Sequence, residues 1–344
     1  MSWSFLRRRL IAPLALLLVA GLAAACGSGG GEAGGNGVSG PWSSVVDAAK
    51  KEHELVVYGF TSPSVQAAIT AFEAKYGIKV QLVSGRPTDL IARIQSEQRA
   101  QKFLGDVYLP NQCSVAGEAK LGMYAPQREL PNFSRLKPEY AKALKASPWG
   151  APFQLNYLAL LTNKGLVPEG AFSSWQGLTD PKWKGKLLSD SMSIPGVGSL
   201  WFQQTYEVLG ADFHKKVAAQ EPVVGRQTAA NERSVASGEF AAYFPFLYSH
   251  SDDVKGLPVR VVVPDEGLPF DLGWAVTLRN APHINAAQVF INELLSQEFQ
   301  DTLVKMPYGS VTGPGVDPVK GIGPRNCDAV EKAASDAVSI YGKK

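Results

Sequence analysis

The chain has 344 residues, of which 45% are hydrophobic and 19% are charged, the composition of an ordinary soluble globular protein. Its formal net charge is +3, but the 34 basic residues less Arg7, Arg8 and Arg9 equal the 31 acidic residues, so the chain after these arginines is neutral. A protein that neutralises many phosphates needs a concentrated basic surface, so this balance excludes a nucleic-acid-binding role.

Residues 1–26 are predicted to be a signal peptide. The three arginines precede an apolar run from Leu10 to Ala25, which is shorter than the roughly twenty residues that a spanning helix needs. The stretch Leu22 to Cys26 resembles a bacterial lipobox, whose cysteine is lipidated and becomes the first residue, although the leucine lies one place farther from Cys26 than usual. Plain cleavage that leaves a free cysteine is the alternative. We expect an exported protein, anchored by the lipid to the outer face of the cytoplasmic membrane.

Residues 27–41 are predicted to be a flexible tether, because glycine dominates them and such a composition cannot bury a core. About three hundred residues follow, more than one hydrophobic core usually serves. The sequence therefore predicts two domains beyond the tether.

Strand and helix patterns alternate directly after the tether. A βαβαβ order predicts a parallel sheet with helices on its faces. Ligands of such sheets collect at the carboxyl ends of the strands, here Phe60 to Ser62, Ser84 to Arg86, and Asn111 with Gln112. The predicted elements are strand 55–58, helix 65–76, strand 78–83, helix 88–102 and strand 106–109.

Two unusually long strand patterns, 151–163 and 268–278, are predicted to carry the chain from one domain to the other and back. Between them lie patterns for a second α/β unit, and helix 285–303 follows and is expected to pack on the first domain. The units of the second domain are strand 187–188, helix 199–209, helix 229–237 and strand 241–246.

The predicted fold class is α/β, with two Rossmann-like lobes joined by a two-strand hinge and a ligand cleft between the lobes. Lobe 1 is expected to comprise residues 42–155 and 272–344, and lobe 2 residues 156–271. A cleft between hinged lobes is a natural site for a small molecule.

Besides Cys26, the chain contains only Cys113 and Cys327. Two cysteines outside the cytoplasm can form a disulfide, and two isolated buried thiols are the alternative. The sequence has no cysteine and histidine spacing typical of a zinc site, and no cofactor is predicted.

Five motifs follow one another along the chain: LVVYG at 55–59, FEAKYGIKV at 72–80, GDVY at 105–108, DPKWKGK at 180–186 and VASGE at 235–239. Together they resemble the extracellular solute-binding proteins of ABC importers, which have the type II periplasmic-binding fold, and among them the ferric-iron-binding group. The resemblance covers nearly all of the chain after the tether. It implies capture of a small solute and its delivery to a membrane permease with its ATPase, by a protein expected to be monomeric.

The chain departs from the ferric-binding pattern where that pattern places its ligands. Relatives of that group bind iron through two adjacent tyrosines after the Gly-Glu motif, often with a histidine after the first strand and a glutamate after the third. Here Tyr248 occupies the first tyrosine position, but Ser249 follows it, and Asn111 stands where the glutamate would lie. Ferric iron is therefore the alternative substrate, bound by Tyr248 with help from His250. In the other interpretation, these two residues are ordinary packing or surface residues.

Neutral hydrogen-bonding groups and a few cations are instead expected to face the cleft, which favours a small organic anion such as a carboxylate or phosphonate. Arg86 is the candidate for a bidentate contact, and a solvated loop arginine is its alternative. Phe60, Tyr157 and Trp274 could stack on an apolar part of the ligand. The predicted ligand-binding residues are Thr61, Ser62, Arg86, Asn111, Gln112, Asn156, Ser199, Arg226, Asn231 and Tyr248, with Ser84, Gln154 and Thr228 as further polar groups facing the cleft.

An exported hydrolase is the alternative from a different class. The chain has neither a Gly-x-Ser-x-Gly elbow nor a glycine-rich phosphate loop, and His214 and His250 have no partner nucleophile in a recognisable motif. The sequence therefore favours a binding protein over an enzyme.

Overall fold

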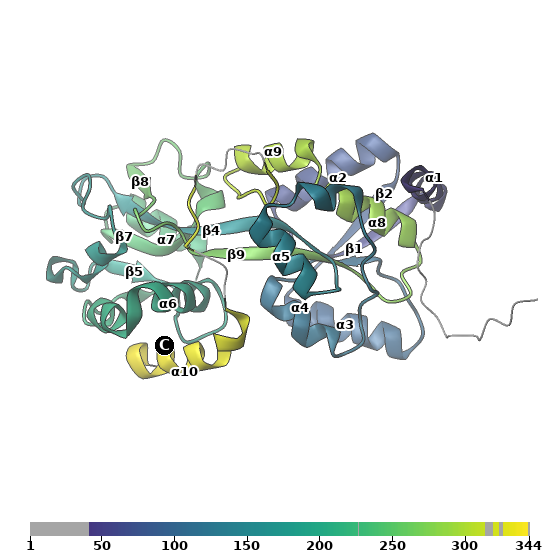
Figure 1. Ribbon diagram of the computed structural model, residues 1–344. Helices are drawn as coiled ribbons and strands as arrows, with labels where there is room; N and C mark the ends of the chain where they lie inside the picture. The colour runs from purple at the N-terminus through teal and green to yellow at the C-terminus, as the bar shows by residue number, and fades with distance from the viewer. Residues whose placement is uncertain (1–40, 226, 314–318, 323–325, 343–344) are drawn as a thin grey trace, which may run out of the picture. The chain divides into compact units, whose positions relative to one another are not determined.

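The computed structural model describes residues 41–225, 227–313, 319–322 and 326–342, all within one compact unit, Asn36–Lys344. The predicted signal peptide, Cys26, most of the tether and Arg226 lie outside these residues. A nine-stranded sheet has the order β2-β1-β3-β9-β4-β7-β5-β6, with β8 paired to β4 (Figure 1). Within the described part of the chain, no helix has the length and apolarity needed to cross a membrane.

The first half of the chain forms the β2-β1-β3 end of the sheet. β1 pairs in parallel with both β2 and β3, which confirms the predicted βαβαβ unit. The carboxyl ends of β1 and β3 therefore lie side by side at one edge. The elements are α1 (Trp42–Glu52), β1 (Glu54–Gly59), α2 (Pro63–Tyr76), β2 (Lys79–Ser84), α3 (Pro87–Arg99), β3 (Val107–Tyr108), α4 (Gln112–Ala119) and α5 (Pro138–Ala146).

Two long strands continue from this end of the sheet into the other, as Figure 1 shows. They are β4 (Ala151–Asn163) and β9 (Phe270–Thr277), and they pair antiparallel with each other. β9 also pairs with β3, and β4 with β7 and β8, so the two strands connect the sheet's halves. The prediction of two crossing strands is confirmed.

The residues between β4 and β9 build the other end of the sheet. Its core is aromatic: the ring of Trp201 lies 5.5 Å from that of Trp175 and 5.0 Å from that of Phe244, and all three side chains are fully buried. The elements are β5 (Leu187–Ser189), α6 (Val197–Ala218), β6 (Val223–Val224), α7 (Thr228–Ala236), β7 (Ala242–Leu247) and β8 (Val259–Val262).

Helices α8 (Ile284–Glu293) and α9 (Gln297–Lys305) replace the single helix predicted over 285–303, which was wrong. The break comes at Ser296, whose hydroxyl accepts a hydrogen bond from the backbone N–H of Phe299 and so starts a new helix. α8 still packs on the first half of the chain, as expected, with Phe290 edge-on to Phe72 at 5.2 Å.

Helix α6 is longer than the predicted 199–209. It runs on to Ala218 through Gly210, which is not helical and has a φ of 78°, a conformation open to glycine. The sequence analysis also did not predict α4 and α5: α4 has only eight residues and includes Gly117, and α5 lies in a segment whose prolines favour turns.

The last described helix, α10 (Val330–Tyr341), packs against α6 (Figure 1). The hydroxyl of Tyr341 lies 2.9 Å from Nδ1 of the fully buried His214 on α6. The predicted lobe boundaries had put residues 272–344 with lobe 1, whereas this helix contacts an element of the segment 156–271. The boundaries themselves stay a prediction.

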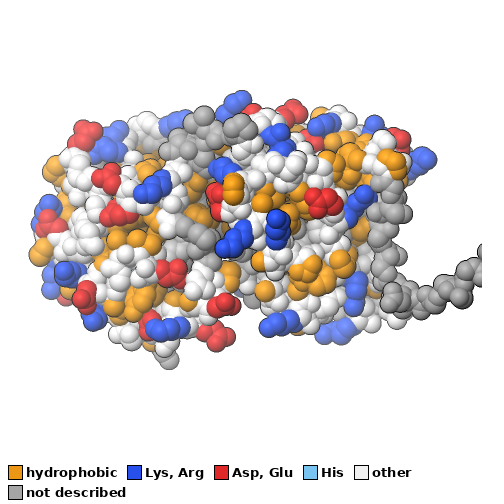
Figure 2. Space-filling model, in the orientation of Figure 1, with side chains coloured by type: hydrophobic (Ala, Val, Ile, Leu, Met, Phe, Trp, Pro, Cys, Tyr) orange, Lys and Arg blue, Asp and Glu red, His pale blue; other side chains and the backbone are white. Residues whose placement is uncertain are grey.

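Acidic and basic side chains are interspersed over the face that Figure 2 shows. This distribution agrees with the neutral charge balance of the chain beyond its N-terminal arginines. The surface in view thus has the mixed charge of a soluble protein that does not track a polyanion.

Candidate functional site

A cavity of about 790 Å³ lies where β1 and β3 end and α6 begins. Residues from both ends of the sheet line it, together with the crossing strands β4 and β9 and the C-terminal helix α10. Its size is in the range of small-molecule sites.

Three helices begin at this cavity. Their N-cap residues, Ser62 for α2, Asn111 for α4 and Gly196 for α6, all line it. Backbone N–H groups in the first turn of a helix have no partner within the helix, and the helix dipole places partial positive charge there. Three such ends around one cavity create a region that favours an anionic group.

The helix starts differ in how far their N–H groups are already satisfied. The Ser62 hydroxyl accepts from the N–H of Val65 at 3.2 Å, and Oδ1 of Asn111 accepts from the N–H of Ser114 at 3.0 Å. α6 has no side-chain cap of this kind, because its N-cap residue is glycine. The first turn of α6 is therefore the end with the most capacity to bind an anion.

Gly198 lets the start of α6 lie close to the loop after β5. A Cβ atom built on Gly198 would come within 2.2 Å of the carbonyl oxygen of Ser191. Any larger residue would push the first turn of α6 away from this loop. The glycine thus fixes where the N–H groups of α6 point.

Amide groups on the crossing strands form part of the wall. Asn156 of β4 lines the cavity, and Gln154 donates from Nε2 to Oδ1 of Asn156 at 3.3 Å. Gln154 itself is fully buried, so its role is to orient Asn156 rather than to contact a ligand. Asp271 of β9 also lines the cavity.

Apolar and aromatic side chains complete the lining. Phe60, which is 37% exposed, follows β1, and the largely buried Tyr308 lines the same cavity. The aliphatic members are Pro63, Leu158, Met192, Pro195, Val197, Leu200, Leu247, Val330, Ala333 and Ala334. A ligand with both a charged end and an apolar or ring portion fits such a wall.

His250 is the titratable ring of the site. It lines the cavity from just after β7, and its Nδ1 lies 2.9 Å from Oε1 of Glu232. The hydrogen bond to Glu232 raises the pKa of His250 above its ordinary value of 6.5, against the opposing effect of burial. His250 consequently brings a positive charge to the cavity at low pH.

Five of the ten predicted ligand-binding residues line this cavity: Thr61, Ser62, Asn111, Asn156 and Ser199. Thr61, Ser62 and Asn111 were predicted because they follow a strand, Ser199 because it opens a helix, and Asn156 as a polar residue of the crossing strand β4. The Ser199 hydroxyl bonds to Gly196, with Gly196 N–H donating to it at 3.0 Å, so it helps to shape the start of α6.

Four other predicted residues lie elsewhere. Arg86 has an 82% exposed side chain and pairs with Asp89 at 2.9 Å, and Gln112 lines a smaller cavity beside α5. Tyr248 meets the ring of Tyr157 edge-on at 6.4 Å. Asn231 is buried and donates to Asp190, 3.4 Å away. Arg226 lies outside the described residues.

Asp190 forms a polar cluster with Asn231 and Tyr243 at the end of β5. The Tyr243 hydroxyl donates to Asp190 at 3.0 Å, and burial raises the pKa of Asp190 to about 6 although this hydrogen bond lowers it. The cluster holds the end of β5 against β7, so Asn231 supports the fold rather than the ligand wall.

Ser84 is exposed at the end of β2, Thr228 opens α7, and Tyr157 and Trp274 are buried in the core. None of these four is among the described residues that line the cavity. Of the predicted aromatic contacts, Phe60 alone stands at the wall.

The structure joins Cys113 and Cys327 in a disulfide, and both residues line the cavity. The cysteine pair was visible in the sequence, but the contribution of α10 to the wall was not. Only the disulfide itself, which brings the C-terminal segment to α4, could have pointed to it.

No group of three or more His, Cys, Asp and Glu side chains suited to a metal ion occurs among the described residues. Tyr248, the residue at the tyrosine position of the ferric-binding pattern, is not part of the described cavity wall, and its neighbour Ser249 is. The described wall includes the carboxylates of Asp271 and Glu331, but neither belongs to a group of three side chains that could hold a metal ion, and the remaining polar groups are mostly hydroxyls and amides.

Comparison with known proteins agrees with the fold. A family model described as bacterial extracellular solute-binding protein matches residues 67–315, well over half of the chain. A relative named iron uptake protein A1, from Synechocystis sp., is 28% identical over 293 residues, which span 78% of each chain.

Two solved structures are similar in fold. The periplasmic binding protein AfuA from Actinobacillus pleuropneumoniae, with fructose-6-phosphate bound, has a TM-score of 0.66 at 21% identity and covers 85% of this chain and 99% of its own. Iron-bound HitA from Pseudomonas aeruginosa has a TM-score of 0.67 at 20% identity and covers 84% and 98%. The predicted type II periplasmic-binding fold is confirmed.

Proposed function

Because the chain belongs to the family of bacterial extracellular solute-binding proteins, we propose that its cavity captures a small hydroxylated organic anion for an ABC importer. Members of this family bind solutes and are not enzymes, so the protein is an exported substrate-binding component that delivers its ligand to a permease. The anionic ligand class and the lipid anchor at Cys26 are the parts that go beyond family membership.

The convergence of three helix N-termini on one cavity carries the proposal. A phosphate or carboxylate at the first turn of α6 would accept hydrogen bonds from N–H groups that the helix leaves open. Hydroxyls of Thr61 and Ser62 and the amide of Asn111 lie on the same wall and could bond its remaining oxygens.

The carboxylates of Asp271 and Glu331 line the cavity as well. Carboxylates repel a second anionic group but accept hydrogen bonds from hydroxyls. This mixture supports a ligand with one anionic group and several hydroxyls, such as a sugar phosphate or a hydroxycarboxylate, over a simple inorganic anion. AfuA with fructose-6-phosphate bound has the same fold, which makes that compound a reasonable first probe.

Ferric iron is the second candidate, since iron uptake protein A1 and HitA are similar proteins. The position of Tyr248 outside the described cavity wall and the serine that follows it weigh against direct coordination by phenolates. Iron would enter this site only together with an organic anion that supplies the missing ligands.

Titration calorimetry against fructose 6-phosphate, citrate, 2-aminoethylphosphonate, inorganic phosphate and a ferric salt tests the proposal. We expect binding of at least one hydroxylated anion, and weaker binding in Ser62→Ala, which also loses about 1 kcal/mol of stability with the cap of α2. Ser296→Ala is the matched control, because it removes an equivalent cap from α9 at 3.2 Å without touching the cavity.

Binding of ferric salt alone, with a visible tyrosinate band that disappears in Tyr248→Phe, would replace the anion proposal with the iron alternative. Equal loss of affinity in Ser62→Ala and Ser296→Ala would show that the cavity is not the site.

A further inference from the structure

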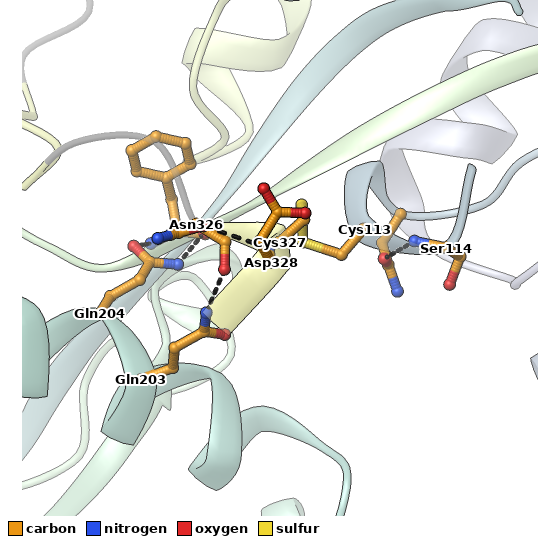
Figure 3. Close-up of a disulfide and its surroundings, with 9 residues drawn as sticks. Cys113, Ser114, Gln203, Gln204, Asn326, Cys327 and Asp328 are labelled. Atoms are coloured by element: carbon orange, nitrogen blue, oxygen red, sulfur yellow. Dashed lines mark hydrogen bonds between the residues drawn. A yellow bond between two sulfur atoms is a disulfide. The ribbon is translucent and has the colours of Figure 1, made fainter. Parts of the chain in front are cut away.

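The disulfide connects opposite sides of the cavity. Cys113 lies in the first turn of α4, which follows β3 at the β2-β1-β3 end of the sheet. Cys327 starts the short 3₁₀-helix Cys327–Ala329 that leads directly into α10. Figure 3 shows this bond between the two segments, whose Cα atoms are 5.0 Å apart although 214 positions separate them in the sequence.

Helix α10 is fastened to α6 on the other side. Tyr341 reaches His214, and the ring of Tyr341 meets that of Phe202 edge-on at 5.9 Å. At the start of the segment, Nε2 of Gln203 on α6 donates to the carbonyl oxygen of Asn326, as Figure 3 shows. α6 follows β5, so these contacts tie α10 to the β7-β5-β6 end of the sheet.

One side of α10 forms part of the cavity wall. Val330, Glu331, Ala333 and Ala334 line it beside Cys327, whereas Ala337 is fully buried. Side chains of α10 and the three helix starts therefore belong to the wall of the same cavity.

We propose that the Cys113–Cys327 disulfide is a clasp that holds α10 in the ligand site and restricts how far the cavity opens. The inference rests on the proposed function, because it assigns α10 to the same cavity. Opening the cavity separates α4 from α6, and α10 is bonded to the first and packed on the second. With the clasp in place, α10 stays at the ligand; without it, α10 can leave with α6 and the wall is incomplete.

A disulfide that merely stabilised the chain would act differently. Loss of such a disulfide would lower the global stability, because the unfolded chain would be less restricted. The native position of α10 and the ligand affinity would stay unchanged. The clasp predicts a local change in the native state, which can be measured without knowing the ligand.

Hydrogen exchange in the ligand-free double variant Cys113→Ser/Cys327→Ser provides this measurement. We expect amides of α10 to exchange at least about tenfold faster than in the wild type while those of α3 are unchanged. Ser296→Ala, which lowers stability at a remote cap, is the control and should leave α10 as protected as in the wild type. Unchanged protection of α10 in the double variant would overturn the proposal.

Reduction of the bond in the folded wild-type protein offers the same comparison without a substitution. A phosphine converts the disulfide into two thiols as it takes up an oxygen from water and becomes a phosphine oxide, which balances the two electrons and two protons. Faster exchange in α10 after reduction supports the clasp, and unchanged exchange contradicts it.

Affinity for fructose 6-phosphate separates the inference from the proposed function. We expect the dissociation constant to be about tenfold larger in the double variant than in the wild type, and unchanged in Ser296→Ala. Equal affinity of the double variant and the wild type would refute the role of α10 as a ligand wall. Absence of binding to every anion by the wild type would instead refute the ligand class, and the exchange experiment would still decide on the clasp.

Discussion

His250 is the residue through which pH would act on the cavity. Its partner Glu232 is buried, and its ring meets Phe246 edge-on at 6.4 Å, so the imidazole is held in one position. Glu232 and, more weakly, Asp253 raise the pKa of His250, and burial lowers it. Protonation places a cation in the wall of the cavity at which the three helices start.

Anion affinity should therefore fall as the pH rises through the raised pKa of His250, that is, above the ordinary value of 6.5. Loss of a charge near a partly solvated anion costs on the order of 1 kcal/mol, or about fivefold in affinity. The measurement is a series of titrations with fructose 6-phosphate in the wild type and in His250→Gln. A pH dependence that survives in His250→Gln would assign the effect to another group.

The hydrogen bond between His250 and Glu232 also makes the stability of the fold depend on pH. Because the folded pKa of His250 is raised, its contribution to stability is complete below the unfolded value and is lost as the pH rises through the folded value. Stability and anion binding should thus decline over the same pH range.

At the scale of elements, the start of α6 decides what the cavity can bind. Its glycine cap leaves N–H groups open, and the close approach of Gly198 to Ser191 sets their direction. α2 and α4 start at the same cavity but use their Ser62 and Asn111 side chains to cap themselves. Each of the three helices follows a strand of the sheet, but they differ in how many of their first-turn N–H groups are open to a ligand.

Gly198→Ala should displace the first turn of α6 and lower both stability and anion affinity. The added Cβ meets a backbone oxygen, which cannot rotate away, so we expect a loss of about 1–3 kcal/mol in stability. Gly196→Ala is the matched control, since a Cβ there has no atom closer than 4.0 Å. Urea unfolding and titration of both variants check the prediction, and equal behaviour of the two would contradict it.

The elements that could be predicted from the sequence are those with a local signal. The alternation of apolar strands and amphipathic helices up to Leu109 predicted the parallel unit of β1, β2 and β3, and the excess length of β4 predicted a strand that crosses between the two ends of the sheet. The place of a ligand site at the strand ends followed from the same pattern. Thr61, Ser62 and Asn111 followed from that rule alone, because they come directly after β1 and β3.

Contacts between distant parts of the chain had no such signal. Nothing in residues 330–341 indicated that this helix would pack on α6. Arg86 is a different case, because its partner Asp89 is only three residues away and its exposed position matches the alternative of a solvated loop arginine. Asn231 likewise has the composition of a ligand group, but burial beside Asp190 gives it a structural role.

On the scale of the whole molecule, the sheet and the disulfide limit movement in different ways. β4 and β9 connect the two ends of the sheet by backbone hydrogen bonds, and the disulfide connects them again across the cavity. The predicted lipid anchor and nearly all of the predicted tether lie outside the described residues, and the proposal is that they keep this unit at the membrane. A solute-binding protein kept near its permease in this way gains effective concentration without any new contact.

The predicted lipid at Cys26 makes this arrangement testable. Burying acyl chains in the bilayer contributes about 0.8 kcal/mol for each CH₂ group, so a lipidated protein should fractionate with membranes. Expressed in a bacterial host, Cys26→Ala should move to the soluble fraction outside the cytoplasm, whereas Cys113→Ser/Cys327→Ser, which keeps Cys26, should stay with the membranes. Mass spectrometry of the N-terminal peptide should find the lipid on Cys26. Because plain cleavage would leave that cysteine free, an unmodified Cys26 in a soluble wild-type protein would favour ordinary secretion over anchoring.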